Sequence, residues 1–594
     1  MDLYLIVIIM LALAVSGLVV GVANDAVNFL NSALGSKAAP RYVIMTVASV
    51  GIIVGAITSN GMMEVARSGV FHPEMFTFAE VMLLFLAVMF TNVILLDIFN
   101  TLGMPTSTTV SLVFGLLGAA VGISIFKIAN DALVTLPDGS LATMADMINT
   151  GNAMAIIGGI LISVVIAFVC GTVVMYITRL IFSFRYQSKL KSYGAVWCGI
   201  ALTAISYFAV FKGLKGTQVI PADWMSWMEG HIPMMLGGLL VGWSLIMSIL
   251  SMLKVNILRI TVLAGTFSLA LAFAGNDLVN FIGVFVAGVD AYDIVRTTGD
   301  TNMLMGGLND PVVANLLILF LSGAVMVVTL WFSKKAQSVS DTEINLARQD
   351  VGVERFGSTS ASRAIVRATI NCNKNYEKYT PERIQRFIAS RFVPVANAKD
   401  KAPFDLIRAT VNLTVASLLI SMATSLQLPL STTYVTFMVA MGSSLSDRAW
   451  GRESAVYRIT GVLTVIAGWF FTALVAFTVS FAVAVLLMWG GVFAVAGLSV
   501  LCCYLMIRST KAHNRKLKRE AEKQAEHKAV TDESSIVDRS VREITEMMNK
   551  VTTIYNQTLI GLFNEDRKLL KNMVRESEAL YQVAHERKHE VLPT

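Results

Sequence analysis

The sequence has few charged residues for its length. Asp, Glu, Lys and Arg make up 15% of its 594 residues, while 55% are hydrophobic; a soluble domain carries about 25% charged residues. This composition excludes an ordinary soluble protein and indicates a polytopic membrane protein. The formal net charge of +7 does not favour nucleic-acid binding, because the basic residues gather at the ends of apolar runs and in two polar segments. That distribution orients a chain in a bilayer.

Features of enzymes and of disulfide-stabilised proteins are also scarce. Four of the five cysteines lie in apolar segments and Cys372 stands alone, so neither a metal site nor a disulfide framework is indicated. None of the six histidines lies in a repeated motif, and the Gly-x-x-x-x-Gly-Lys-Ser/Thr loop of nucleotide hydrolysis is missing. We therefore expect no enzyme and no cofactor, with an ion gradient as the energy source. The first apolar run lacks a basic leader, so residues 1–22 are expected to remain as a helix.

Apolar runs long enough to span about 30 Å of hydrocarbon recur along the chain. They predict helices near 2–22, 41–59, 77–99, 108–126, 153–178, 193–211, 232–251, 257–274, 309–332, 405–425, 432–446, 455–488 and 491–507. Trp489-Gly490-Gly491 is the expected break before the last of them.

Two motifs occur twice in the same order. Gly21–Asn28, containing Asn24-Asp25-x-x-Asn28, is matched by Ala274–Asn280, and Met104–Thr109 by Leu428–Thr433. Asn24 to Ser107 is 83 positions and Asn276 to Ser431 is 155; the 70 residues of 334–403 account for nearly all of the difference. The two halves are therefore predicted to be one unit written twice, with a loop inserted in the second.

The expected organisation has seven parts. They are a first transmembrane repeat (1–185), connecting helices (186–252), the first part of a second repeat (253–333), a cytoplasmic loop (334–403), the second part of that repeat (404–490), an additional transmembrane helix (491–508) and a cytoplasmic helical tail (509–594). Basic residues near the membrane helices predict the cytoplasmic position of loop and tail.

The loop and the tail differ in pattern. In the loop, Pro381–Phe387 could begin a short amphipathic helix, and a solvated linker is an equal alternative. In the tail, apolar residues between 536 and 584 recur at spacings of three, four and seven, which predicts amphipathic helices. Gly561 and Asn564–Asp566 are typical of the break and N-cap between two helices.

The Pro-x-Ser-Thr-Thr motif suits an oxyanion. Pro105 and Pro429 favour the start of a helix, so each Ser-Thr-Thr run is expected at or near a helix N-terminus. There, unpaired N–H groups, the positive end of the dipole and three hydroxyls form an anion cradle. The motif contains no arginine, which suits an ion that must be released after binding.

The Asn-Asp-x-x-Asn motif suits a small cation. Its carboxylate and amide oxygens are hard ligands, and one interrupted helix can present them together. With Asp25 and Asp277 ionised, a divalent oxyanion could approach only if cations neutralised them. Alternatively the two aspartates take up protons, because burial disfavours the charged form.

Structural explanations exist for each motif alone. Ser and Thr in membrane helices often bond to their own backbone or join helices, and an Asn-Asp pair can cap a helix. Repetition of both motifs in the same order favours a binding site. The runs Gly115–Gly122 and Gly283–Gly288 indicate close helix packing, and Asp97 and Asn100 are alternative site residues.

Together these motifs resemble those of the inorganic phosphate transporter (PiT) family, over about residues 1–490 without the loop. The resemblance implies an all-α polytopic membrane protein with two inverted structural repeats, interrupted helices and re-entrant hairpins, which carries phosphate with sodium or protons. The implied phosphate ligands are Ser107, Thr108, Thr109, Ser431, Thr432 and Thr433. The implied cation ligands are Asn24, Asp25, Asn28, Asn276, Asp277 and Asn280, with Asp25 and Asp277 binding sodium. Val110 and Tyr434 stand where the family often has histidine.

We interpret the sequence as a secondary transporter that imports inorganic phosphate with sodium or protons. A sulfate permease of the same fold and an anion-binding sensor that signals through its tail are the alternatives. The expected partners are phosphate, the coupling cation and membrane lipid, with no nucleic acid; a homo-oligomer is compatible with the sequence. The expected location is the bacterial inner membrane. The tail resembles a PhoU-like helical domain over one helical pair, and a generic helical hairpin is the alternative.

Overall fold

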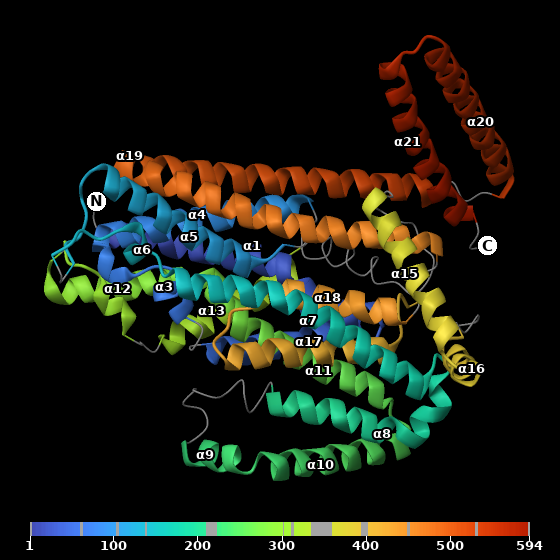
Figure 1. The fold of residues 1–594 in the computed structure, drawn as a ribbon, viewed down its shortest axis with the longest axis horizontal. Coiled ribbons are helices and arrows are strands. Elements are labelled where there is room, and N and C mark those ends of the chain that lie inside the picture. Colours follow the sequence, from blue (N-terminus) through green and yellow to red (C-terminus); the bar gives the residue numbers. More distant parts are fainter. Residues whose placement is uncertain are drawn as a thin grey trace. The chain divides into compact units, whose positions relative to one another are not determined.

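A computed structural model gives the fold of most of the chain (Figure 1). It describes residues 3–59, 63–102, 106–136, 139–208, 222–300, 302–310, 314–333, 359–393, 402–447, 452–528 and 533–591. Met104 and Pro105 of the first motif lie outside these ranges, as do residues 334–358 and 394–401 of the predicted loop.

The described residues form helices nearly throughout. The first half contains α1 (Leu3–Gly35), α2 (Arg41–Ile57), α3 (Glu64–Ser68), α4 (Phe78–Leu102), α5 (Thr108–Ala129), α6 (Met144–Met147), α7 (Thr150–Phe182), α8 (Tyr186–Ile205), α9 (Ala222–Gly230) and α10 (Ile232–Met252). The second half contains α11 (Ile257–Leu278), the π-helix η4 (Val279–Gly283), α12 (Val284–Thr298), α13 (Leu316–Phe332), α15 (Ser360–Tyr379), α16 (Glu382–Arg391), α17 (Leu406–Ser425), α18 (Thr432–Ser446) and α19 (Arg452–Lys528). The tail contains α20 (Glu533–Phe563) and α21 (Arg567–Val591).

Length and composition identify the membrane-spanning part. Among the described residues, eight helical segments are long and apolar enough to cross a membrane, and α2 and α13 are shorter apolar helices. The chain is therefore an integral membrane protein with an all-helical fold. It divides into two compact units, Met1–Asp350 with Ser358–Ser509, and Val351–Gly357 with Thr510–Thr594.

Helix pairings in the first unit recur between the halves. α1 packs on α4 as α11 packs on α17, and α4 packs on α5 as α17 packs on α18. The pairs α4–α5 and α17–α18 each form a helical hairpin. One arm of each hairpin packs closely against a further helix. A Cβ added at Gly118 of α5 would lie 2.2 Å from the carbonyl oxygen of Phe477 in α19, and one added at Gly442 of α18 would lie 2.3 Å from that of Phe168 in α7. These pairings support an internal duplication of one structural unit. The inversion of one copy relative to the other stays a prediction.

The helices that carry Asn-Asp differ from the expectation of interrupted helices. α1 continues without a break through Asn24 and Asn28 to Gly35, because side chains of the hairpins satisfy these polar groups and the backbone need not open. The second copy departs from α geometry at Val279–Gly283, a π-helical turn that includes Asn280. The clear interruptions are those between α4 and α5 and between α17 and α18.

Two local predictions can be compared directly with the structure. The expected break near Gly491 is confirmed, since α19 leaves helical geometry there with φ 49° and ψ −130°. The segment after Pro381 is a helix, α16, rather than a linker, and Pro381 itself is its N-cap. The loop also contains α15, which the apolar pattern of the sequence did not indicate.

Candidate functional site

Each Ser-Thr-Thr run begins a helix. Ser107 is the N-cap of α5, and its Oγ accepts a hydrogen bond of 3.1 Å from the backbone N–H of Val110. Ser431 caps α18 in the same way, with 3.2 Å to the N–H of Tyr434. The predicted helix N-termini are therefore confirmed. Serine rather than proline makes the cap, because Pro429 lies two positions before Ser431 and outside the helix.

Asp25 of α1 contacts both hairpin tips. Its carboxylate accepts hydrogen bonds from Thr108 Oγ1 at 3.0 Å and from Thr433 Oγ1 at 3.1 Å. Asn24 Nδ2 donates to it at 2.7 Å and also to the carbonyl oxygen of Thr106 at 2.8 Å. One α1 carboxylate thus joins α5 to α18.

Asp277 of α11 makes the equivalent contacts with the partners exchanged. Its carboxylate accepts from Thr432 Oγ1, and from Thr109 Oγ1 at 3.3 Å. Asn276 Nδ2 donates to it at 3.0 Å and to the carbonyl oxygen of Leu430 at 2.7 Å. Each aspartate therefore takes one hydroxyl from each hairpin.

The last asparagine of each motif reaches the hairpin of the other half. Asn28 Nδ2 donates to Thr432 Oγ1 at 3.3 Å and to Thr433 Oγ1 at 3.1 Å. Asn280 Nδ2 donates to Thr108 Oγ1 at 3.3 Å and to Thr109 Oγ1 at 2.9 Å. These cross-contacts interlock the two copies.

The structure thus brings all twelve predicted residues to one buried place. None of them is more than 5% exposed. In the central network the two carboxylates accept hydrogen bonds only from neutral side chains, all threonine or asparagine. Among the described residues, no group of three or more His, Cys, Asp or Glu could hold a transition metal. The donor set is one for a hard cation.

The site contains groups suited to both charges. The oxygens Asn24 Oδ1 and Asn280 Oδ1 are buried and have no hydrogen-bond partner in the described part of the chain. Each can therefore serve as a ligand for a cation. In α5 the serine cap takes only the N–H of Val110, and the N–H groups of Thr108 and Thr109, in the first turn, have no partner within the helix. Both groups lie within one hydrogen-bonded network, so a cation and an anion can be held close together.

Several members of the network were not predicted. Thr436 Oγ1 donates to Asn28 Oδ1 at 3.3 Å, and it lies one helical turn after Thr432 on the same face. The carbonyl oxygens of Thr106 and Leu430 also belong to the network. A backbone oxygen is present at every residue, so the residue type does not predict this role. Asn100, an alternative site residue, donates to the carbonyl oxygen of Val20 at 2.7 Å, so its amide joins α4 to α1.

Aromatic rings lie beside the second hairpin tip. Tyr434 stacks on Trp469 of α19 with ring centroids 3.8 Å apart. Phe437, nearly one helical turn further along α18, meets the same Trp469 edge to face at 5.9 Å. The first turns of α18 are therefore supported by apolar packing as well as by the serine cap.

Buried ion pairs tie the far ends of the hairpin arms. In the first hairpin, Lys127 of α5 donates to Glu80 of α4 at 2.8 Å and to the carbonyl oxygen of Met75 at 2.9 Å. In the second, Asp447 accepts from Arg408 Nε at 2.9 Å and from Arg179 Nη2 at 3.0 Å. The side chains of Asp447, Arg408 and Arg179 are fully buried. The charges of the two pairs run in opposite directions along the chain.

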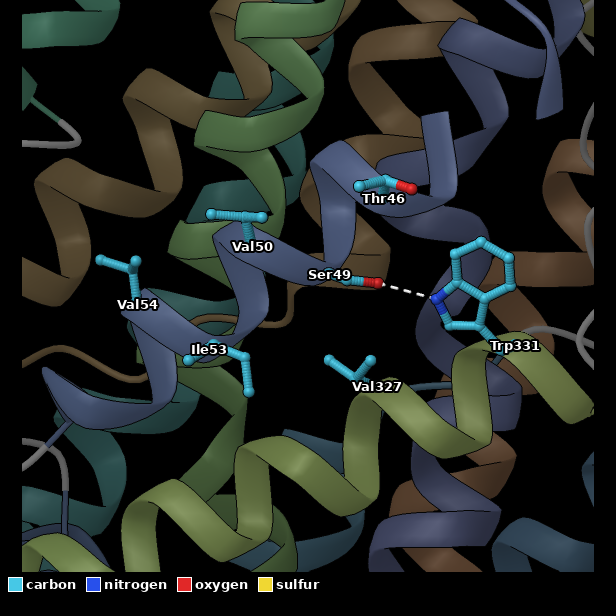
Figure 2. Close-up of a pocket in the computed structure, with 7 residues that line it drawn as sticks. All are labelled: Thr46, Ser49, Val50, Ile53, Val54, Val327 and Trp331. Atoms are coloured by element: carbon cyan, nitrogen blue, oxygen red, sulfur yellow. Dashed lines mark hydrogen bonds between the residues drawn. The ribbon is translucent and has the colours of Figure 1, made fainter. Parts of the chain in front are cut away.

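A groove between α2 and α13 has a different chemistry (Figure 2). It has a volume of about 420 Å³ and is lined by Thr46, Ser49, Val50, Ile53, Val54, Val327 and Trp331. Trp331 Nε1 donates to Ser49 Oγ at 3.0 Å along its edge. No residue of the repeated motifs lines it, and its walls are mostly apolar. It is a separate surface feature and not the polar site.

Comparisons with known proteins identify the family of the chain. A model of the phosphate transporter family (PHO4) matches residues 21–336. A Thermococcus kodakarensis protein, named as a candidate phosphate permease, is 25% identical over 200 residues, which cover 33% of this chain and 45% of that protein, less than half of its length. A solved structure, "The sodium-dependent phosphate transporter", shares the fold with a TM-score of 0.57 and 18% identity, over 82% of this chain and 99% of its own. The chain belongs to the phosphate transporter family.

Proposed function

We propose that the protein imports inorganic phosphate across the bacterial inner membrane by symport with sodium. The observation that carries the proposal is the meeting of two carboxylates and two helix N-termini in one buried network. Ser107, Thr108, Thr109, Ser431, Thr432 and Thr433 are the proposed phosphate ligands. Asn24, Asp25, Asn28, Asn276, Asp277 and Asn280 are the proposed cation ligands.

Charge explains why the two ions would travel together. A unit negative charge about 5 Å from another is repelled by about 3 kcal/mol at an effective dielectric constant of ~20. A phosphate dianion beside Asp25 and Asp277 carries two charges and meets about twice that repulsion from each carboxylate. Sodium bound at the carboxylates removes most of it, so phosphate binds well only after the cation.

The hydrogen bonds supply a second link. The hydroxyl of Thr108 donates to Asp25, and that of Thr432 donates to Asp277. A hydroxyl has one proton, so it cannot donate to aspartate and to phosphate at once. A cation that takes over the carboxylate oxygens frees these hydroxyls to turn toward the anion. The same exchange in reverse helps release.

The remaining parts of the proposal concern placement. Two related halves around one central site suit alternating access, in which one half moves against the other. The lysines and arginines of 508–528 favour a cytoplasmic tail under the positive-inside rule. The two halves are inverted repeats within the seven-part organisation of the chain that the sequence predicts.

The direct test is uptake of labelled phosphate into proteoliposomes. Sodium and proton gradients are imposed separately, and excess sulfate is added as a competitor. We expect uptake under an inward sodium gradient, with little effect of sulfate. Uptake driven by protons alone would change the coupling ion, and suppression by sulfate would change the substrate.

Binding without flux under either gradient would overturn the transporter itself and favour a sensor. Liposomes without protein give the leak. The Thr553→Ala variant, in the tail and far along the chain from the motifs, controls for reconstitution.

A further inference from the structure

Within the described part of the chain, one apolar stripe of the tail hairpin has no partner. α20 and α21 lie side by side (Figure 1), and Gly561 of α20 packs close to Leu570 of α21. A separate set of α20 side chains points to solvent. These are Val541, Ile544, Met548, Val551, Tyr555 and Leu562, each between 49% and 63% exposed. We call this set the α20 seam.

The spacing of the seam is that of a coiled coil. Its members follow one another at three, four, three, four and seven residues, which places them at heptad positions a and d. The d position between Tyr555 and Leu562 holds Thr558, which is half-buried. Met547, Ile554 and Gly561 also repeat every seven residues and are half-buried or buried. They occupy position g, next to the seam and on the side of α21. α20 therefore carries two apolar stripes, and the hairpin covers only one of them.

The charges of α20 argue for a helix as the occupant. The four charged residues between 541 and 562 all fall at positions b, c and f, so none lies in the seam or on its flanks. Over its whole length α20 has three basic and four acidic residues. A helix that lies on an anionic membrane surface carries an excess of lysine and arginine, and α20 lacks it.

The same charges point to a second copy of this chain. In coiled coils, charges at positions e and g set partner choice, and like charges there would repel an identical helix. In α20 they hold threonine, leucine, methionine, isoleucine and glycine between 541 and 562. Two identical helices can meet there without like-charge repulsion. Copies in one membrane also share its surface, which raises their effective concentration.

We propose that the α20 seam is a self-association surface, on which the tails of two copies form a four-helix bundle. Each copy contributes α20 at the centre and α21 beside it. Such bundles bury a and d positions of facing helices in one core. The proposal concerns the tail alone and is independent of what the membrane unit carries.

Cysteine cross-linking of the full chain in membranes tests this surface. Cysteine is placed singly at Val541, Ile544, Met548, Val551 or Tyr555, and the parent chain with its native cysteines gives the background. Glu546→Cys and Thr553→Cys, both at position f, are the matched controls. We expect oxidation to give a product of twice the chain mass at one or more seam positions and not at the controls. A parallel pair would react at every seam position, and an antiparallel pair only near its two-fold axis.

A charge in the seam is the second arm. Val551→Glu added to the cysteine variant that reacts best should abolish the product, while Lys550→Glu at position c should leave it. Failure of every seam position to react above background would overturn the proposal, as would equal reaction at the position-f controls. A cross-link to a protein of another mass, in place of the doubled product, would assign the seam to a different partner and overturn self-association.

Discussion

The two hairpins make equivalent contacts at their tips and different contacts at the ends of their arms. At the tips, a serine caps the helix and two threonines reach an aspartate of each half. At the arm ends, the first hairpin has a single Lys127–Glu80 pair that is partly exposed on the glutamate side. The second has Asp447 held by Arg179 and Arg408, with Asp405 2.7 Å from Arg179. The tips therefore make equivalent contacts in the two halves, whereas the arms are held by different ion pairs.

The difference predicts which helices behave as one rigid group. Arg179 belongs to α7, so its bonds to Asp447 and Asp405 fasten α7 to both arms of the second hairpin. The Lys127–Glu80 pair only joins α4 to α5. A buried pair adds little net stability but is costly to break when one partner is removed. We therefore expect α7, α17 and α18 to behave as a more rigid group than α4 and α5.

The largest expected effect tests the equivalence of the tips. Asp25→Asn and Asp277→Asn should each abolish sodium-driven phosphate uptake, because each removes one of the two charges that we propose hold the cation. Both variants keep the size and most hydrogen-bond capacity of the side chain, so the protein should still fold, as checked by its melting temperature in detergent. Wild-type uptake in either variant would show that the two halves do not share the site.

The next effect tests the difference between the arms. Asp447→Asn removes a buried charge shared by two arginines and should destabilise the protein by about 3–5 kcal/mol. Glu80→Gln should cost less, about 1–3 kcal/mol, because Lys127 keeps its bond to the carbonyl of Met75. Denaturant unfolding of both variants measures the gap. Equal losses would mean that the extra arginine makes no difference.

Close packing of the arms should give a smaller and equal effect. Gly118→Ala and Gly442→Ala each place a Cβ within 2.3 Å of a backbone carbonyl oxygen, and overpacking of this kind costs about 1–3 kcal/mol. Gly158→Ala in α7 is the control, since nothing lies within 4 Å of its added Cβ. A loss in only one of the two hairpin variants would show that the arms are seated differently.

The smallest effect concerns the caps. Ser107→Ala and Ser431→Ala should each cost about 1 kcal/mol, and the corresponding glycine variants only a few tenths, because glycine is tolerated at an N-cap. Thermal unfolding in detergent compares the four variants. Phosphate binding is measured on the same variants. If both alanine variants lose more free energy of phosphate binding than free energy of unfolding, the serine hydroxyls contact the anion as well as the backbone.

What could be predicted from the sequence depended on local pattern. The sequence predicts that Ser107 and Ser431 lie at helix starts, because proline and serine favour a helix start in the residues that directly follow them. The pairing of Arg179 with Asp447 could not be predicted, since 268 positions separate them and neither lies in a repeated motif. The continuity of α1 past Asn24 was also missed, because whether a polar motif breaks a helix depends on the partners that tertiary packing provides.

The π turn at Val279–Gly283 gives the two halves unequal aspartates. It turns Asn280 back toward its own motif, so that Asn280 Nδ2 donates to Asp277 at 2.7 Å in addition to the bonds from Asn276, Thr109 and Thr432. Asp25 accepts from three side chains instead of four. An arriving ion has fewer donors to displace at Asp25, so ligand exchange should begin there. A π turn holds one residue more than an α turn, and we expect that small shift in register to give a duplicated site an order of events.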